Sequence, residues 1–314
     1  MAVTDATGYA HPDYAASFAE FATPRELPAS GGWILERQIA GSGLRDAMGC
    51  YPIFVCRDWR RLGEDLDAIA DDLVTLTLVT DPFGTASMDE LAGSFDVVRH
   101  FKDHYVVDLR EPMAERLPRR HRRNLAKASQ RVEVTVCEEP IRLLDEWLSL
   151  FGVLVERHGI TGMRAFSHDA FALQLEVPGL VMLEARADDE LVGLHLWYIH
   201  DAVAYGHLGA TSDLGYELMA AYSLYGYAVE HLRTRVRWLD LGAAAGLSRQ
   251  GGRDGLTAFK QGWATGTRPA YLCGRIFHPQ RYSELSAAAT DDGPYFPAYR
   301  LGELGDRVSD RTVE

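Results

Sequence analysis

The stretch VRWLDLG, residues 236–242, is followed by a glycine-rich loop and then by LTAFKQGW, residues 256–263. The first run predicts an apolar strand that ends beside the acidic Asp240. The second predicts a short helix, and a closing strand is expected over about 269–277. This order of strand, loop and helix places Lys260 on a short helix that the chain enters from the loop, with aromatic side chains packing beneath it.

Upstream of this stretch, the pattern predicts three short strands and a long helix. LVMLEARA, LVGLHLWYI and AVAYGHLGAT follow one another at short spacing, and Asp188-Asp189 divides the first two, which predicts an antiparallel meander. The long helix is expected over about 217–233. Two helices precede the meander: an amphipathic one over 141–159, ended by Gly159 in the C′ position, and a shorter one capped by Ser167.

The first half of the chain shows a shorter version of the same alternation. Two strands with a helix between them are expected within 51–79, and Ser87 with Glu90 forms a capping box ahead of a further helix. Two brief strands follow, at 96–101 and at 104–108. The chain as a whole is therefore predicted to be mixed α/β, built from two similar halves.

Composition and charge narrow the class of protein. At 314 residues, with 47% hydrophobic and 25% charged residues, the chain has an ordinary globular composition and a length that favours two domains. The net charge of −13 argues against coating of nucleic acid by the whole surface, so we expect no DNA partner and assign any polyanion to a local patch. The absence of a long apolar run and of a signal-peptide pattern predicts a cytoplasmic protein without integral membrane association.

Two features receive no functional assignment. The first 30 residues are polar, alanine-rich and aperiodic, which predicts a loosely docked N-terminal arm. The four cysteines lack a CxxC pair or a nearby histidine at ligand spacing, so they predict buried free thiols and no metal site. These cysteines are Cys50, Cys56, Cys137 and Cys273.

A basic segment stands out against the acidic background. RLPRRHRRNLAKASQR, residues 116–131, holds seven Lys or Arg and no acidic residue, and Pro118 predicts the start of a helix. Cations in a first helical turn oppose the macrodipole, so a stabilising role for them is not expected. Arg119, Arg120 and Arg123 are instead candidates for contact with phosphates, which arginine binds bidentately. The alternative is a solvated basic face paired with acidic residues of the other half.

The segment around Lys260 resembles the C-terminal signature of FemAB-like acyltransferases, a double form of the GNAT fold. An acidic residue just before Gly at the end of a core strand, a short loop and then Gly-Leu-x-x-Phe-Lys-x-Gly carry the resemblance, which extends over roughly 50–280. The basic helix is similar to that family's segment between the two halves. The matching residues are Asp240, Gly242, Gly255, Leu256, Phe259, Lys260 and Gly262.

The resemblance implies two GNAT-like domains with mostly antiparallel central sheets flanked by helices. Residues 31–140, completed by 278–314, would form the domain on the side of the amine acceptor, and residues 141–277 the donor and catalytic domain. Family members transfer an amino acid from aminoacyl-tRNA to an amine, and relatives are acyl-CoA N-acetyltransferases. Lys260 would stabilise the charge that develops on the donor carbonyl, as oxyanion-hole donors do. Arg253, in the loop before the helix, and Phe259 are candidate substrate-binding residues.

Two strands of the meander supply further candidates. Tyr205 and His207 share one face of their strand, and His195 and Trp197 share one face of its neighbour. We expect these two strands to be the pair that splays and admits the donor. His207 is then a candidate base for the attacking amine, and Tyr205 and Trp197 candidates for substrate contact, although each histidine can equally be a hydrogen-bonded core residue.

Asp240 is the third candidate catalytic residue, after Lys260 and His207. Its carboxylate is expected either to orient Lys260 or a donor amino group, or to cap the loop that follows the strand. The sequence leaves both possibilities open.

One segment departs from acetyl-CoA-dependent GNAT proteins. These usually carry Q/R-x-x-G-x-G/A where the pyrophosphate is held, whereas this chain reads TSDLGYELMAA at 211–221, with Gly215 as its single glycine. This difference favours aminoacyl-tRNA as co-substrate, with no resident cofactor, and leaves acetyl-CoA as the alternative. A non-catalytic double GNAT that binds RNA or protein is a further alternative.

Overall fold

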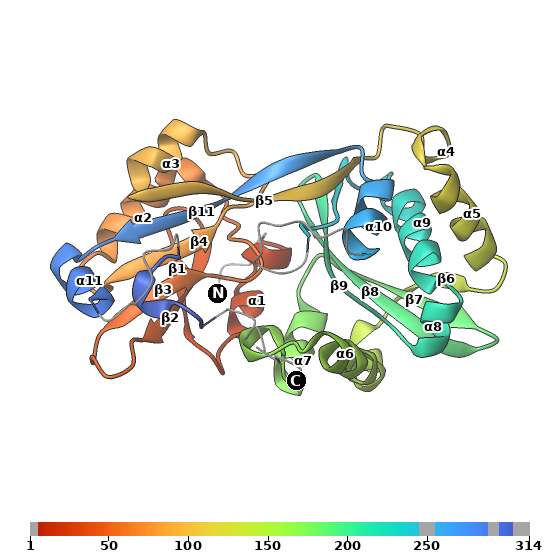
Figure 1. Ribbon diagram of the computed structural model, residues 1–314, viewed down its shortest axis with the longest axis horizontal. Helices are drawn as coiled ribbons and strands as arrows, with labels where there is room; N and C mark the ends of the chain where they lie inside the picture. The colour runs from red at the N-terminus through yellow and green to blue at the C-terminus, as the bar shows by residue number, and fades with distance from the viewer. Residues whose placement is uncertain (1–5, 245–254, 288–294, 304–314) are drawn as a thin grey trace, which may run out of the picture.

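One continuous mixed sheet runs through the molecule. The computed structural model describes residues 6–244, 255–287 and 295–303 (Figure 1). Most neighbouring strands pair antiparallel, which confirms the predicted mixed α/β class. Across the sheet the strands are β1 (Thr23–Leu27), β2 (Gly32–Gln38), β3 (Arg45–Gly49), β4 (Thr75–Val79), β11 (Gly266–Ile276), β5 (Val97–Asp108), β10 (Trp238–Asp240), β9 (Val203–Thr211), β8 (Glu190–His200), β7 (Leu180–Ala187) and β6 (Glu133–Cys137).

Helices cover both faces of this sheet, and their apolar sides meet it in separate core clusters. None of the described helices is long and apolar enough to span a membrane. The described helices are α1 (Pro12–Ala16), α2 (Leu62–Ala68), α3 (Met88–Ser94), α4 (Met113–Arg116), α5 (Arg119–Ala128), α6 (Leu144–His158), α7 (His168–Glu176), α8 (Asp213–Glu217), α9 (Ala220–Leu232), α10 (Gly255–Trp263) and α11 (Pro279–Ser286), with 3₁₀ turns at Gly8–Ala10, Trp59–Arg61, Pro140–Leu143, Gly162–Arg164 and Ala298–Arg300.

Two long strands join the halves (Figure 1). β5 pairs with β11 along nearly its whole length, and its last residues also pair with β10. The sequence predicts two brief strands at 96–101 and 104–108, but the structure has one strand of 12 residues, whose ladder shifts register opposite Ala270/Tyr271. A shift in the pairing register therefore takes the place of the predicted break between two strands. The strands of both halves belong to one sheet.

The N-terminal segment is part of the core, so the prediction that it docks loosely is wrong. Tyr9, Tyr14 and Phe18 are each at most 4% exposed and pack between the sheet and α7. Residues of β1 then pair with β2. The aromatic side chains lie four or five residues apart, and this spacing puts them on one buried side without a regular pattern long enough to predict a helix.

Local signals in the second half are confirmed. Gly159 ends α6 with a left-handed φ of 60°, and the Ser167 side chain accepts a hydrogen bond from the backbone N–H of Ala170. The capping box of Ser87 and Glu90 is also present. The predicted helix over 217–233 is wrong at its start, because Met219 adopts a left-handed conformation and separates α8 from α9.

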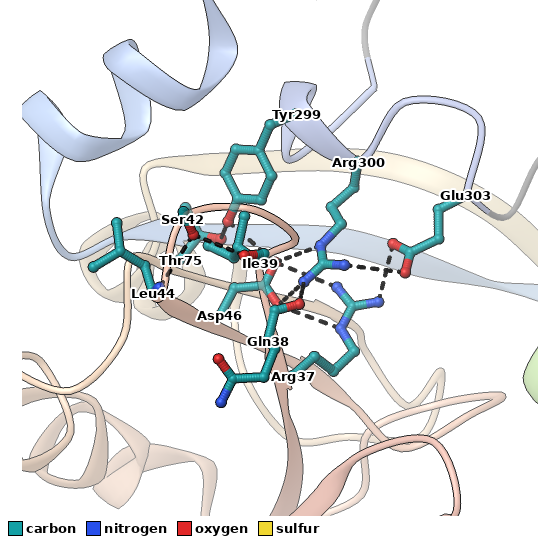
Figure 2. Close-up of polar contacts among 10 residues, drawn as sticks. All are labelled: Arg37, Gln38, Ile39, Ser42, Leu44, Asp46, Thr75, Tyr299, Arg300 and Glu303. Atoms are coloured by element: carbon teal, nitrogen blue, oxygen red, sulfur yellow. Dashed lines mark hydrogen bonds and ion pairs between the residues drawn. The ribbon is translucent and has the colours of Figure 1, made fainter.

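The C-terminal segment is fastened to the first half by a buried carboxylate (Figure 2). Asp46 on β3 is fully buried and accepts two hydrogen bonds of 2.9 Å from the Arg300 guanidinium. The Tyr299 hydroxyl donates to the same carboxylate at 3.1 Å, and Arg37 forms an ion pair with it at 3.3 Å. A buried carboxylate needs such partners, because desolvation otherwise destabilises its charged form.

We expect Arg300→Ala to lower the free energy of unfolding by about 2–4 kcal/mol, because the carboxylate of Asp46 would stay buried with fewer donors. Urea unfolding followed by circular dichroism measures this. The matched control is Arg60→Ala, which removes an exposed arginine from its pair with Asp58 and should leave the urea midpoint unchanged. Equal midpoints for both variants would show that the Arg300 pair does not fasten the C-terminal segment.

Candidate functional site

The sheet opens between β9 and β10. These two strands pair in parallel from Trp238↔Val203 to Asp240↔Tyr205, and β9 then continues to Thr211 without β10 beside it. The sequence predicted that β8 and β9 splay, and this is wrong: their antiparallel ladder runs without a break in pairing from His200↔Val203 to Gly193↔Thr211, with one register shift. The candidate site is therefore the end of β10.

Asp240 lies at that end, 2% exposed, with both carboxylate oxygens in use. Its Oδ1 accepts a 2.7 Å hydrogen bond from the backbone N–H of Gly242, so the side chain caps the loop, as one of the two sequence interpretations held. Its other partner is His104 of β5, whose Nδ1 lies 2.8 and 3.0 Å from the two oxygens. His104 was not among the residues predicted from the sequence, since no local pattern relates two residues 136 positions apart.

Two lysines donate hydrogen bonds to backbone carbonyls of the loop after β10. Lys260 Nζ donates to the Ala243 carbonyl at 2.8 Å, and Lys102 Nζ donates to the Ala244 carbonyl at 2.9 Å. The chain has three lysines, so two of them meet at one turn. Burial and the nearby Arg164 guanidinium lower the pKa of Lys102. Cations from both halves thus surround the end of β10.

Phe259, beside Lys260, is part of an aromatic cluster. Its ring lies 4.9 Å from that of Tyr222 and 4.8 Å from that of Tyr225, both on α9. On α5, His121 lies 3.0 Å from the Phe259 carbonyl through Nε2, and a Cβ at Gly262 would come within 2.0 Å of its ring. This packing explains the Phe-Lys-x-Gly pattern, because the aromatic ring and the glycine dock α10 on α5 and α9 while the lysine is directed to the loop.

His207 and Tyr205 share one face of β9, as predicted, but protein groups occupy their polar atoms. His207 Nε2 lies 3.1 Å from Gln174 Oε1, and its Nδ1 lies 3.2 Å from the Tyr9 hydroxyl. Burial lowers the pKa of His207 to about 3. This geometry favours the hydrogen-bonded core histidine over the base.

Tyr205 connects the two halves through a carboxylate. Its hydroxyl donates to both oxygens of Asp81, at 2.9 and 3.0 Å, and Phe83 N–H donates to the same carboxylate at 2.9 Å. Burial is the main reason that the pKa of Asp81 is raised to about 7, with the charge of Asp240 adding to it. Asp81 therefore lies in the electrostatic field of the residues at the end of β10.

His195 and Trp197 lie on the opposite face of the sheet, with ring centroids 4.6 Å apart. His195 stacks on Tyr225 of α9, and its pKa is lowered to about 3 by burial and then by the charge of Lys260. Trp197 is fully buried. Both residues are therefore packed in the core, and His195 lies close enough to Lys260 to be affected by its charge.

The basic segment forms α5, which lies along α9 at one end of the molecule (Figure 1). Arg119, Arg120, Arg122 and Arg123 are all exposed. Within the described part of the chain no carboxylate lies within 4 Å of any of them. The pairing with acidic residues that the sequence left as an alternative is thus not seen there. Arg253 lies outside the described residues.

The segment at 211–221, which stands where acetyl-CoA-dependent GNAT proteins hold the pyrophosphate, uses its own polar groups in local hydrogen bonds and ion pairs. Ser212 caps α8 by accepting from Gly215 N–H at 3.1 Å, and a Cβ at Gly215 would lie 2.0 Å from the Val192 carbonyl oxygen. Asp213 stands in the first turn, paired with Arg157 at 2.7 Å. A carboxylate and an occupied N–H are poor partners for a pyrophosphate.

Sequence comparison and this geometry agree on the second half of the chain. Residues 116–260 match the family model of the acetyltransferase (GNAT) domain. This segment is a GNAT domain. It contains α5 at its start and Lys260 at its end, so the GNAT domain includes the basic helix as well as the end of β10. The four cysteines are free thiols, as predicted; Cys50, Cys56 and Cys273 are buried, whereas Cys137 is only half-buried.

Three solved structures share the fold over most of the chain. FemX has a TM-score of 0.65 at 13% identity, covering 87% of this chain and 93% of that one. The C-terminal domain of a putative lysylphosphatidylglycerol synthetase from Agrobacterium fabrum has a TM-score of 0.60 at 16% identity, covering 85% and 88%. L-PGS from Bacillus licheniformis has a TM-score of 0.54 at 14% identity, covering 87% and 94%.

These likenesses confirm the resemblance to FemAB-like proteins at the level of the fold, which extends beyond the GNAT domain to both halves. The domain boundaries drawn from the sequence stay a prediction. No curated protein matches the sequence.

Proposed function

We propose that this protein is an acyltransferase that forms an amide bond by moving an aminoacyl group from aminoacyl-tRNA to an amine. The observation that carries the proposal is the position of Lys260, whose ammonium lies at the end of β10 where β9 and β10 separate. Attack of an amine on an ester builds negative charge on the carbonyl oxygen. A fixed cation beside that oxygen stabilises the transition state more than the ground state.

The closed turn at Ser212 supports tRNA over coenzyme A as the carrier of the acyl group. The N–H of Gly215 is already bonded, and Asp213 would repel a pyrophosphate. FemAB-like proteins of this fold use aminoacyl-tRNA, which favours the same donor here.

The exposed arginines of α5 supply a surface for the donor. Arg119, Arg120 and Arg123 present guanidinium groups that can pair with phosphates, on a protein whose net charge otherwise repels them. Because α5 packs directly on α10 through His121, a polyanion bound at α5 would lie next to the helix that carries Lys260. The acceptor in this proposal is a small amine.

A second candidate is an acyl-CoA-dependent N-acetyltransferase. The match of residues 116–260 to the acetyltransferase domain favours it. In that case the arginines of α5 would contact the phosphates of coenzyme A instead of RNA.

Transfer of radiolabel tests the choice of donor. The full-length protein is incubated with a pool of small amines and either a mixture of charged tRNAs or labelled acetyl-CoA. We expect label to move from charged tRNA, at a rate that falls when the tRNA is deacylated beforehand. Transfer from acetyl-CoA alone would replace the proposal by the second candidate, and transfer from neither would leave the non-catalytic binding protein.

A further inference from the structure

The hydrogen-bonded pair of His104 and Asp240 brings a basic group of the first half to the end of β10. Asp240 accepts from His104 Nδ1 at 2.8 and 3.0 Å, and both side chains are buried, at 8% and 2% exposure. Since Nδ1 carries the proton that the carboxylate accepts, the neutral imidazole has its lone pair on Nε2. No hydrogen bond joins Nε2 to any residue that the structure describes.

We infer that His104 is the residue that takes the proton from the attacking amine, with Asp240 as the positioning residue that fixes its tautomer and orientation. The inference rests on the proposed function for the reaction, but not on the choice between tRNA and coenzyme A as carrier. Both donors present a carbonyl that an amine attacks, and both require that a proton leave the nitrogen.

The placement of His104 relative to Lys260 follows from Gly242. The N–H of Gly242 donates to Asp240, while a Cβ on its other side would lie 3.3 Å from Lys260 Nζ. The backbone of Tyr105 forms two hydrogen bonds with the residues that follow β10. Its carbonyl accepts from Leu241 N–H at 2.9 Å, and its N–H donates to the Gly242 carbonyl at 3.1 Å. The end of β10 is therefore enclosed between the imidazole and the ammonium.

The two groups approach from opposite faces of the sheet. Successive side chains of a strand alternate, so His104 and Tyr105 point to opposite sides. The Tyr105 hydroxyl accepts from Gln261 of α10, on the side of Lys260, at 3.3 Å. His104 thus lies on the side covered by the N-terminal segment. A carbonyl placed where β9 and β10 separate would have the ammonium on one side and the base on the other.

Three other described histidines of the sheet do not offer this geometry. His207 has both ring nitrogens occupied, and His195 is stacked beneath Tyr225. His100, on the same strand as His104, is exposed and pairs with Asp103 at 3.0 Å. Asp81 lies close enough for the charge of His104 to lower its pKa, so the imidazolium formed in the reaction would have two carboxylates near it.

The step balances without a further reactant. The amine nitrogen forms a bond to the carbonyl carbon, the carbonyl π electrons move to the oxygen beside Lys260, and the attacking nitrogen loses a proton to His104 Nε2. The electron pair on that oxygen then re-forms the carbonyl, the bond from carbon to the leaving oxygen of the tRNA ribose breaks with its electron pair on the ribose oxygen, and His104 gives its proton to the ribose oxygen. For a thioester donor the proton goes to sulfur in the same way.

The test compares kcat of His104→Asn with that of the wild-type protein and of His100→Asn. An asparagine amide at position 104 keeps a donor for Asp240 but removes Nε2. We expect kcat to fall by about 10²–10⁴-fold, with the KM for the donor little changed, and His100→Asn to behave like the wild type. Added imidazole should restore part of the activity, and the loss should shrink with an amine of low pKa such as hydroxylamine.

Asp240→Asn supplies the second variant, because its side-chain oxygen can still accept from Gly242. We expect a smaller loss that also shrinks with hydroxylamine, which a loss of stability alone would not produce. A kcat of His104→Asn equal to that of His100→Asn, or a loss independent of the amine, would overturn the inference.

Two further measurements distinguish a failure of the proposed function from a failure of the role inferred for His104. If only acetyl-CoA serves as donor, the same variants are measured with acetyl-CoA. If neither donor serves, modification of histidines by diethyl pyrocarbonate, mapped by mass spectrometry, decides: reaction at His104 ahead of His195 and His207 supports an available Nε2, and an unmodified His104 overturns it.

Discussion

Replacing Lys260 by alanine is expected to lower kcat by about 10²–10³-fold while the KM for the donor stays nearly unchanged. The ammonium would act on charge that exists only in the transition state, so its removal should not weaken binding of the donor. Steady-state kinetics with charged tRNA as the varied substrate measures both constants.

The structural role of Lys260 must be separated from this effect, because Nζ also donates to the Ala243 carbonyl. Lys260→Met keeps the aliphatic stem and should lose as much activity as the alanine variant. Gln261→Ala removes a neighbouring exposed side chain from the same helix and should retain wild-type kcat. A raised KM with unchanged kcat in both Lys260 variants would instead assign the lysine to donor binding.

Simultaneous replacement of Arg119, Arg120 and Arg123 by alanine is expected to weaken binding of tRNA by about 10²-fold at low salt and to reduce the slope of log affinity against log salt by about 2 to 3. Each phosphate contact that is lost stops the release of about one counterion. Filter binding or fluorescence anisotropy over a series of salt concentrations measures both quantities.

The control replaces Arg60 and Arg61, which are exposed arginines of the first half paired with Asp58 and Glu64. This variant changes the net charge almost as much but should leave the salt slope as it is. With saturating tRNA, the triple variant of α5 should recover the wild-type kcat. A slope equal to that of the control would show that α5 is a solvated face without contact to nucleic acid.

Much of the second half was predictable because its signals are local. The strands of the meander, the end of α6 at Gly159 and the cap at Ser167 follow from residues at most a few positions apart. The motif around Lys260 also lies within one stretch of sequence, and its resemblance to FemAB-like proteins was confirmed as a fold. The N-terminal segment was missed because isolated aromatic residues such as Tyr9 and Tyr14 contain no periodic pattern.

The candidate site was only half predictable for the same reason. Local sequence patterns were enough to predict that an acidic residue ends a core strand and that a lysine follows on a short helix. The tertiary contacts place β5 beside β10, which gives Asp240 its partner His104, and they put the opening of the sheet between β9 and β10 instead of between β8 and β9. Strand order and register depend on the burial of whole strands, so no single stretch of the chain specifies which side chains will meet across them.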